Sequence, residues 1–261
     1  MIDFSIDGYL KTNLDTAKKV IKKDWDMVFL YDGYEGSGKS VKAQQDAFYC
    51  DPSFCIERIA FTPKEFRDAI QIAEPYQAVV YDEAYTGLSS RATMTNVNRA
   101  LVQMLAEIRQ KNLFVFVVMP TFFDLDKYVA LWRSRALIHV YTKDFQRGFF
   151  AFYNIDLKKS LYINGKKFYS YAKPRPNFIG RFTNHYVVDE KEYRNKKRNS
   201  LVNREQKNIQ AEQEKELQDL LFERIMVLDE KHPHTIRMEI LGLPQSTYFY
   251  KLKQWKEKQD N

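Results

Sequence analysis

The chain has 261 residues, of which 44% are hydrophobic and 15% aromatic, enough for one large domain or for a medium domain with a small appendage. Its longest apolar run, 113–119, is far shorter than the roughly 18–20 residues of a membrane span. The N-terminus lacks the basic and apolar regions of a secretory signal, so we expect a cytoplasmic protein. Two cysteines, Cys50 and Cys55, are too few for a disulfide framework or a zinc site and are interpreted as reduced packing residues.

The net charge of +7 is unevenly distributed along the chain. Residues 1–154 carry 19 basic and 19 acidic side chains, which leaves 22 of the 41 basic and 15 of the 34 acidic residues for 155–261. A basic region of this kind indicates an anionic partner, most often nucleic acid, or alternatively a solvated charged face.

The first part of the chain alternates between patterns typical of strands and of helices. Five short apolar runs are predicted strands: 27–31, 59–61, 78–81, 113–119 and 136–141. Helical patterns cover 14–23, 39–49, 96–111 and 125–135. One more helix starts with Thr62 as N-cap, Pro63 at its first position and Glu65 in a capping box. This alternation, with continuously apolar strands, predicts an α/β fold whose parallel sheet is covered on both faces.

The pattern changes after residue 141. We expect an extra strand over 148–153 and a hairpin over 160–171, in which Asn164-Gly165 forms a type I′ turn. Residues 190–218 are charged and poor in large apolar residues, as in an exposed helix or a linker, and apolar periodicity returns over 217–255. The predicted domains are 1–195 with a β-hairpin extension over 148–172, a charged helical linker over 196–216, and a small all-α domain over 217–261.

The run GYEGSGKS over 33–40 matches G-x-x-x-x-G-K-[S/T] and stands between a predicted strand and a predicted helix. In such a loop, backbone N–H groups surround phosphate oxygens, and the helix N-terminus adds partial positive charge. Lys39 can reach the β- and γ-phosphates, and Ser40 can ligate Mg²⁺. A Gly-rich turn without a ligand is the alternative. The predicted cofactors are therefore ATP and Mg²⁺, and the predicted nucleotide-binding residues are Gly33, Tyr34, Glu35, Gly36, Ser37, Gly38, Lys39, Ser40 and Val41.

A second motif, VVYDE over 79–83, ends an apolar strand in two carboxylates. Asp82 is suited to hold the Mg²⁺ shell together with Ser40, and Glu83 is suited to orient and deprotonate the attacking water. An acidic surface turn would have the same composition, but the phosphate-binding motif upstream favours the catalytic interpretation.

Together, GYEGSGKS, the Asp82-Glu83 pair and the apolar strand that follows resemble the branch of P-loop NTPases with an additional strand and a catalytic glutamate. The resemblance implies a sheet ordered 5-1-4-3-2, with 113–119 inserted between the strand before the P-loop and the strand that ends in Asp82. It also implies a polar sensor of the γ-phosphate after the inserted strand. The matching position is Thr121, whereas relatives often have Gln or Asn there.

Within this branch, residues 25–195 look most similar to the FtsK–HerA and zonular-occludens-toxin-like ATPases, which are DNA pumps and phage assembly or packaging motors. The stretches over 180–182 and 186–193 resemble the end of that ATPase module. Ring ATPases of this kind need a cation from the neighbouring subunit to stabilise the transferring phosphoryl group. Arg133 and Arg135 are the favoured candidates and Arg109 is a further one, with an ordinary surface arginine as the alternative for each.

Residues 235–257 resemble a helix-turn-helix module, with a turn over 242–244 between two helices and a preceding helix over 217–229. The helical spacing of Tyr248, Leu252 and Trp255 predicts that they are core residues. A small helical bundle used for subunit contacts is the alternative. The residues left to contact phosphates and base edges of DNA are Gln245, Ser246, Thr247, Tyr250, Lys251 and Lys253.

These features favour an ATP-hydrolysing DNA motor of a virus or mobile element. It would form a homo-oligomeric ring on duplex DNA, with a viral portal or assembly protein as a further partner. The alternatives are an ATP-gated DNA-binding adaptor, such as a helicase loader or replication initiator, and a phage assembly ATPase. A small-molecule kinase is a third and weaker alternative, because a kinase needs no Glu83 to activate water.

Overall fold

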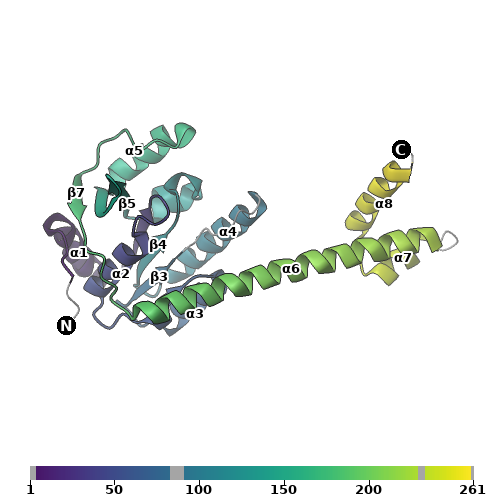
Figure 1. Cartoon of the computed structure of the whole chain (residues 1–261), viewed down its shortest axis with the longest axis horizontal. Coiled ribbons are helices and arrows are strands. Elements are labelled where there is room, and N and C mark those ends of the chain that lie inside the picture. The colour runs from purple at the N-terminus through teal and green to yellow at the C-terminus, as the bar shows by residue number, and fades with distance from the viewer. Residues whose placement is uncertain (1–3, 83–90, 229–232, 260–261) are drawn as a thin grey trace. The chain divides into compact units, whose positions relative to one another are not determined.

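The computed structural model describes residues 4–82, 91–228 and 233–259 and divides the chain into two compact units, Met1–Lys197 and Arg198–Asn261. Among the described residues, no helix combines the length and the apolarity needed to cross a bilayer. Cys50 and Cys55 are both free thiols, as expected. The first unit is a mixed α/β structure built on one sheet (Figure 1).

The sheet has seven strands in the order β2-β3-β4-β1-β5-β6-β7. The first five are parallel, and β6 and β7 extend the sheet antiparallel beyond β5. The expected five-stranded sheet 5-1-4-3-2 is thus not the complete sheet, although its parallel part follows that order when read from β5 to β2. The strands are β1 (Met27–Asp32), β2 (Ile59–Ala60), β3 (Ala78–Tyr81), β4 (Phe114–Val118), β5 (Ala136–Lys143), β6 (Gln146–Tyr153) and β7 (Phe178–Arg181).

Helices cover both faces of the sheet, because side chains alternate between the faces along each strand. In β1, Phe29 and Tyr31 pack in one buried cluster with α1 (Gly8–Val20) and α2 (Lys39–Cys50). Val28 and Leu30 pack in the other cluster, on the opposite face. The helices of that second cluster are α3 (Pro63–Ile72), α4 (Arg91–Ile108) and α5 (Ile155–Gly165).

Local capping explains where several of these helices start. The Asp7 carboxylate accepts from the backbone N–H groups of Tyr9 and Leu10, so α1 begins six residues earlier than its apolar pattern predicts. At α3, the Thr62 hydroxyl accepts from Glu65 N at 3.1 Å, as expected for an N-cap. The Glu65 carboxylate accepts from the N–H of Phe61, one residue before the N-cap, so the capping box is displaced by one position.

Residues 160–171 do not form the predicted hairpin. Residues 160–168 belong to α5 and to the short turn η5 (Lys166–Phe168), and Gly165 has helical rather than left-handed geometry. The Asn154 side chain caps α5 by accepting from Leu157 N at 3.0 Å. The buried residues of this helix recur at helical spacing, which decides between helix and hairpin: they are Lys158, Leu161, Tyr162 and Gly165.

The predicted helix over 125–135 is shorter than expected, with helical residues at 127–133 and π geometry over most of them. The π turn is η4 (Val129–Arg133), and a separate 3₁₀ turn, η3 (Phe122–Asp124), precedes it. The buried Lys158 amine donates to the carbonyl oxygens of Ala130 and Ser134, which satisfies the carbonyl groups of this tight segment. Two further 3₁₀ turns complete the first unit, η1 (Ile21–Lys23) and η2 (Ile56–Arg58).

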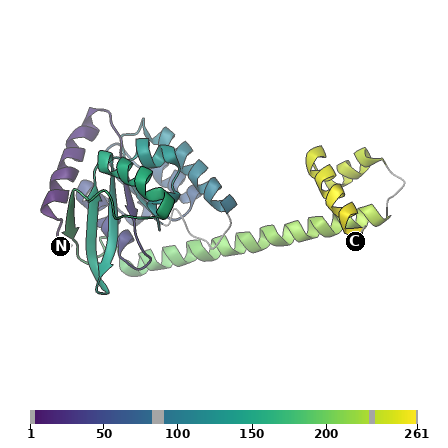
Figure 2. The same cartoon turned by 90° about the horizontal axis from the view of Figure 1, so that it is seen from above.

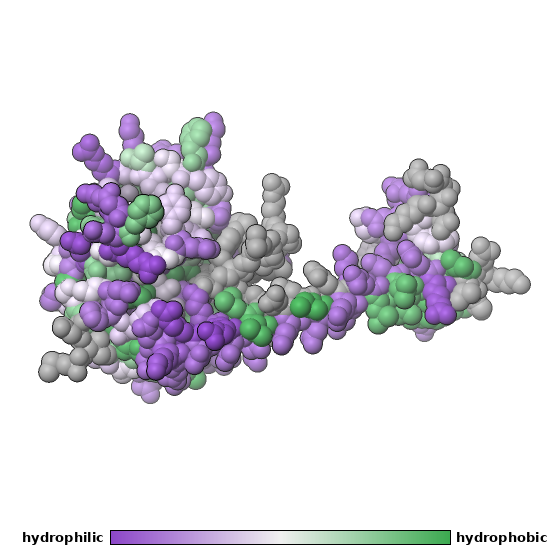
Figure 3. Space-filling model, in the orientation of Figure 1, coloured by the Kyte–Doolittle hydropathy of each residue, from purple (hydrophilic) through white to green (hydrophobic). Residues whose placement is uncertain are grey.

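The second unit is entirely helical in its described part. A single helix, α6 (Glu190–Leu228), spans both the predicted linker and the predicted first helix of the small domain, and α7 (His234–Leu241) and α8 (Gln245–Gln259) follow (Figures 1 and 2). Tyr248 and Leu252 are buried with Phe222 and Met226, and Trp255 packs against them, so the predicted core residues of α8 are confirmed. Apolar side chains also reach the surface of this unit (Figure 3), among them Leu217, Leu220, Leu221 and Val227.

The helical form of 155–165 can be tested with two asparagine substitutions. We expect Asn154→Ala to lower the free energy of unfolding by about 1 kcal/mol, because it removes the N-cap of α5. Asn164→Ala is the matched control: its side chain is exposed on the helix, so we expect a change within about 0.5 kcal/mol. Urea unfolding followed by circular dichroism measures both. A larger loss at Asn164 would instead favour the type I′ turn.

Candidate nucleotide-binding site

The loop over 33–40 leaves the carboxyl end of β1 and enters α2. Gly38, the N-cap of α2, has a φ of 99°, a left-handed conformation that only glycine adopts without strain. Gly33 is constrained by space, because a methyl group on its Cα would lie 1.9 Å from the Val140 carbonyl oxygen of β5. The glycines therefore let the backbone close tightly at the N-terminus of α2, where the helix dipole favours an anion.

Lys39 spans this loop. Its Nζ donates to the carbonyl oxygens of Gly33 at 2.7 Å and Tyr34 at 2.8 Å. Burial lowers the pKa of Lys39, and the negative charges that oppose this effect belong to Asp32, Asp82 and Glu35. The amine is thus held at the loop, in reach of any phosphate group that the loop encloses.

The side chains of the two motifs meet at one point. Ser40 Oγ donates to Asp82 Oδ1 at 3.0 Å, and Asp82 is fully buried directly after β3. The other carboxylate oxygen, Oδ2, accepts from the hydroxyl of Tyr193, near the start of α6. Burial and the charge of Asp82 raise the pKa of Tyr193, which keeps the phenol protonated as a donor. The aspartate is therefore fixed by one hydroxyl on each side, and sequence reasoning did not identify Tyr193.

The remaining loop residues differ in how they are exposed. Tyr34 and Glu35 are exposed, whereas the Val41 side chain is buried, which leaves only its backbone for a ligand. Ser37 is buried, and its hydroxyl has no hydrogen-bond partner among the described residues. An unpaired hydroxyl inside this loop suits a ligand that supplies oxygen acceptors.

The site has the oxygen donors that Mg²⁺ prefers. The described part of the chain contains no group of three or more His, Cys, Asp or Glu side chains suited to a metal ion. Mg²⁺ usually keeps several waters and needs only one or two protein oxygens beside the substrate phosphates. Ser40 and Asp82 supply such oxygens, so the residues present fit a magnesium–nucleotide complex.

Two predicted catalytic residues follow the neighbouring strands. Glu83 lies outside the described residues. Thr121 follows β4 at the same edge of the sheet as the loop, because Gly33 N donates to the Pro120 carbonyl oxygen at 3.2 Å. The Thr121 hydroxyl accepts from Phe123 N at 3.3 Å and so caps the turn η3.

A buried polar cluster beside Thr121 has no signal in the sequence motifs. Asp32, the last residue of β1, accepts from Phe122 N at 3.0 Å and from the Tyr171 hydroxyl, and its Oδ1 lies 2.9 Å from His139 Nδ1. The rings of His139 and Tyr171 stack at 4.0 Å between centroids. These contacts join β1, β4 and β5 just before the loop, and so fix the backbone from which the loop departs.

The arginines favoured as the cation supplied by a neighbouring subunit do not lie beside the loop. Arg133 and Arg135 precede β5, at the amino ends of the parallel strands and therefore opposite the edge that carries the loop. Arg133 Nη2 lies 2.5 Å from Asp26 Oδ2, and its side chain is only 11% exposed. The Arg135 guanidinium stacks 4.6 Å from the Trp25 ring centroid. Both thus contact residues of their own subunit, whereas Arg109 is exposed.

The residues predicted to contact DNA lie on α8. Gln245, Ser246 and Thr247 are exposed in its first turn, and Tyr250 and Lys253 are exposed farther along. Lys251 is less accessible, because its amine forms an ion pair with Asp219 of α6. Five of the six side chains are therefore available to a partner.

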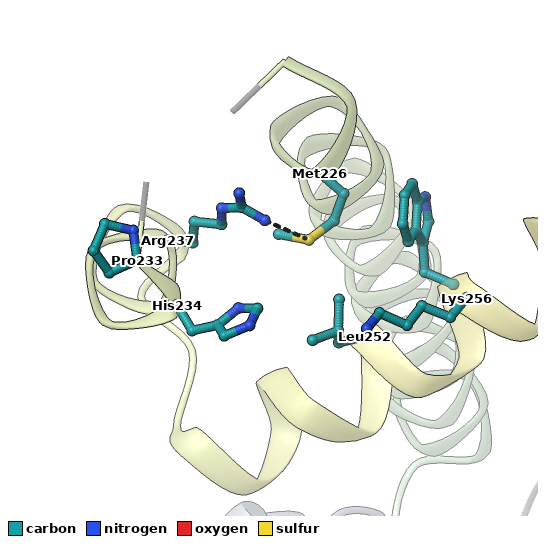
Figure 4. Close-up of a pocket in the computed structure, with 7 residues that line it drawn as sticks. Met226, Pro233, His234, Arg237, Leu252 and Lys256 are labelled. Carbon is teal, nitrogen blue, oxygen red and sulfur yellow. Dashed lines mark hydrogen bonds between the residues drawn. The ribbon is translucent and has the colours of Figure 1, made fainter. Parts of the chain in front are cut away.

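A hollow of about 430 Å³ lies between α6, α7 and α8, on the inner side of these helices (Figure 4). Arg237 is 7% exposed, and its Nη1 approaches the sulfur of Met226 at 3.9 Å. His234 Nδ1 lies 2.9 Å from the Tyr248 hydroxyl. The ionisable side chains that line the hollow are all basic, so it is not suited to a cation: they are His234, Arg237 and Lys256.

Comparisons with known proteins give a likeness in structure but none in sequence. No protein-family model and no curated protein matches the chain. Among solved structures, it is similar to the N-terminal domain of zonular occludens toxin from Neisseria meningitidis, with 18% sequence identity and a TM-score of 0.36. The match covers 65% of this chain and 97% of that one.

The contact between Tyr193 and Asp82 can be tested by removing one oxygen atom. We expect Tyr193→Phe to lower the free energy of unfolding by about 1–3 kcal/mol, because a buried carboxylate oxygen loses its donor. Tyr186→Phe is the matched control: its ring lies 5.4 Å from that of Tyr193, and its hydroxyl has no hydrogen bond among the described residues. Urea unfolding of both variants measures the difference, and equal stabilities would show that the hydroxyl does not hold Asp82.

Proposed function

We propose that this chain hydrolyses the β–γ bond of ATP. The observation that carries the proposal is the 3.0 Å contact between Ser40 and Asp82, behind a glycine-rich loop whose lysine is held at the same point. Ser40 and Asp82 are 42 residues apart in sequence, and their contact supports the interpretation that the two motifs serve one magnesium–phosphate site.

Each residue has a role that follows from its chemistry. The loop amides and Lys39 bind and orient the phosphates, and bound Mg²⁺ neutralises charge on the phosphate oxygens. Ser40 and Asp82 hold the magnesium shell, with Tyr193 fixing the orientation of the carboxylate. Glu83, the next residue after Asp82, takes the proton of the attacking water, and Thr121 contacts the γ-phosphate.

The proposed hydrolysis is tested with two substitutions in the purified chain. We expect Lys39→Ala to weaken ATP binding, and Glu83→Gln to lower kcat by about 10²–10⁴ while ATP binding persists, because a general base contributes to turnover and not to affinity. Glu74→Gln, an exposed carboxylate outside the site, is the control and should leave turnover unchanged. Normal turnover by Glu83→Gln would overturn the catalytic assignment.

We further propose that hydrolysis drives a DNA motor, with a ring of subunits that grips duplex DNA through its basic C-terminal region. The exposed polar first turn of α8 supports this proposal, because amide and hydroxyl groups at a helix N-terminus can contact phosphates and base edges. The exposed leucines of α6, Leu217, Leu220 and Leu221, support self-association, since apolar surface of this kind marks interfaces.

DNA binding is tested with Lys253, which is 78% exposed on α8. We expect Lys253→Gln to weaken binding to duplex DNA for all sequences and to reduce the slope of log K against log salt concentration by about 1, because one phosphate contact is lost. Lys19→Gln, an exposed lysine of α1, is the control and should change neither quantity. Fluorescence anisotropy at several salt concentrations measures both.

Two alternatives retain the ATP site and predict different outcomes. An ATP-gated adaptor, such as a helicase loader or initiator, would bind one DNA sequence tightly and would not translocate. A phage assembly ATPase would hydrolyse ATP at a rate that DNA does not change, and its α7–α8 region would bind a protein partner. Stimulation of hydrolysis by duplex DNA that weakens as salt is added favours the motor.

A further inference from the structure

The antiparallel strands added to the parallel sheet lie against the phosphate-binding loop. A methyl group placed on Gly36 would lie 3.7 Å from Nη2 of Arg147, a residue of β6. One placed on Gly38 would lie 3.1 Å from the ring of Phe182, which directly follows β7. The loop is therefore flanked by a guanidinium group at Gly36 and by an aromatic ring at Gly38.

The backbone around Arg147 is fixed in this position. Gly148 has a φ of 95°, and a methyl group on it would lie 2.6 Å from the Phe182 carbonyl oxygen. Phe182 N donates to the Gly148 carbonyl oxygen at 2.9 Å. Figure 2 shows β5 and β6 as two long adjacent strands, and Arg147 is the second residue of β6, directly after the turn that joins them. Arg147 thus enters the loop region from a hydrogen-bonded sheet and not from a free segment.

The side chain of Arg147 has no polar or aromatic partner among the described residues. It is exposed, and it makes no hydrogen bond, ion pair or ring contact with any other described residue. Other arginines of this unit differ: Arg133 pairs with Asp26, and the Arg181 guanidinium stacks 4.8 Å from the Phe149 ring. A cation held beside a phosphate-binding loop, with its donors unused by the described chain, matches the requirement for charge stabilisation in phosphoryl transfer.

We propose that Arg147 binds the β- or γ-phosphate of ATP held in the loop of its own subunit and stabilises the negative charge that develops during hydrolysis. This assignment rests on the proposed ATP hydrolysis. In that step the water oxygen bonds to the γ-phosphorus, the bond to the β–γ bridging oxygen breaks, and ADP keeps the electron pair. The water proton passes to the general base, so Arg147 donates hydrogen bonds without gaining or losing a proton.

Guanidinium chemistry makes the assignment specific. The planar fork of arginine can donate two parallel hydrogen bonds to phosphate oxygens, whereas lysine offers a single point charge. Steady-state hydrolysis is therefore compared for the full-length wild type, Arg147→Ala, Arg147→Lys and Arg181→Ala. We expect Arg147→Ala to lower kcat by about 10²–10³ with a smaller change in KM, Arg147→Lys to recover part of the loss, and Arg181→Ala to resemble the wild type.

The urea midpoint separates catalysis from folding. Since Arg147 is exposed and unpaired in the described structure, its variants should unfold at the wild-type midpoint. Unchanged kcat in Arg147→Ala, with an active wild type, would overturn the inference and leave the proposed ATP hydrolysis intact. If the wild type does not hydrolyse ATP, the proposed function is disproved, and the inference about Arg147 is disproved with it.

The choice of subunit is tested by co-expressing Lys39→Ala and Arg147→Ala chains with different tags and purifying through both tags in succession. If Arg147 acts on ATP in its own subunit, the mixed assembly stays as inactive as either parent. Restored turnover would show that it acts across an interface and would overturn the same-subunit assignment. If no assembly carries both tags, the two chains do not associate. Hydrolysis of ATP by the wild-type chain, together with its loss in Arg147→Ala, then supports the same-subunit assignment directly.

Discussion

The parallel pairing of β1, β4 and β3 brings the carboxyl ends of three strands to one edge of the sheet, and the candidate site depends on that alignment. Tyr31 pairs with Val118 and Tyr81 with Val117, so the chain leaves β1 and β3 at nearly the same level. Ser40 and Asp82 can then share a hydrogen bond. A shift of one residue in either pairing would turn buried side chains to the other face, so the apolar core itself fixes this register.

Segments late in the chain complete the site. Tyr193 reaches Asp82 from α6, and the Lys196 amine binds the carbonyl oxygens of Ile56 and Ile59, which anchors the start of that helix to the sheet. Gln45 of α2 also donates to the carbonyl oxygens of Thr183 and His185. The stretch over 182–197 is therefore part of the same packed unit as the loop.

Cationic side chains have different roles at the two ends of the parallel strands. At the amino ends, Arg133 is desolvated, and Asp26 compensates its charge, as a buried arginine requires. At the carboxyl ends, Lys39 is partly buried beside carboxylates, and Arg147 remains exposed without a partner among the described residues. This difference in burial and pairing separates cations that stabilise the fold from those available to an anionic ligand.

The sequence by itself determined the strands of the parallel sheet, the loop over 33–40 and its link to Asp82, because these depend on local apolar runs and on residue types at fixed spacing. It did not determine α5, since the Asn164-Gly165 pair suits a tight turn as well as a helix end, and only packing of Leu161 and Tyr162 against the sheet decides between them. Nor did it identify Tyr193 or Arg147. Their positions depend on which strands and helices lie next to the loop, and that is a property of the tertiary structure alone.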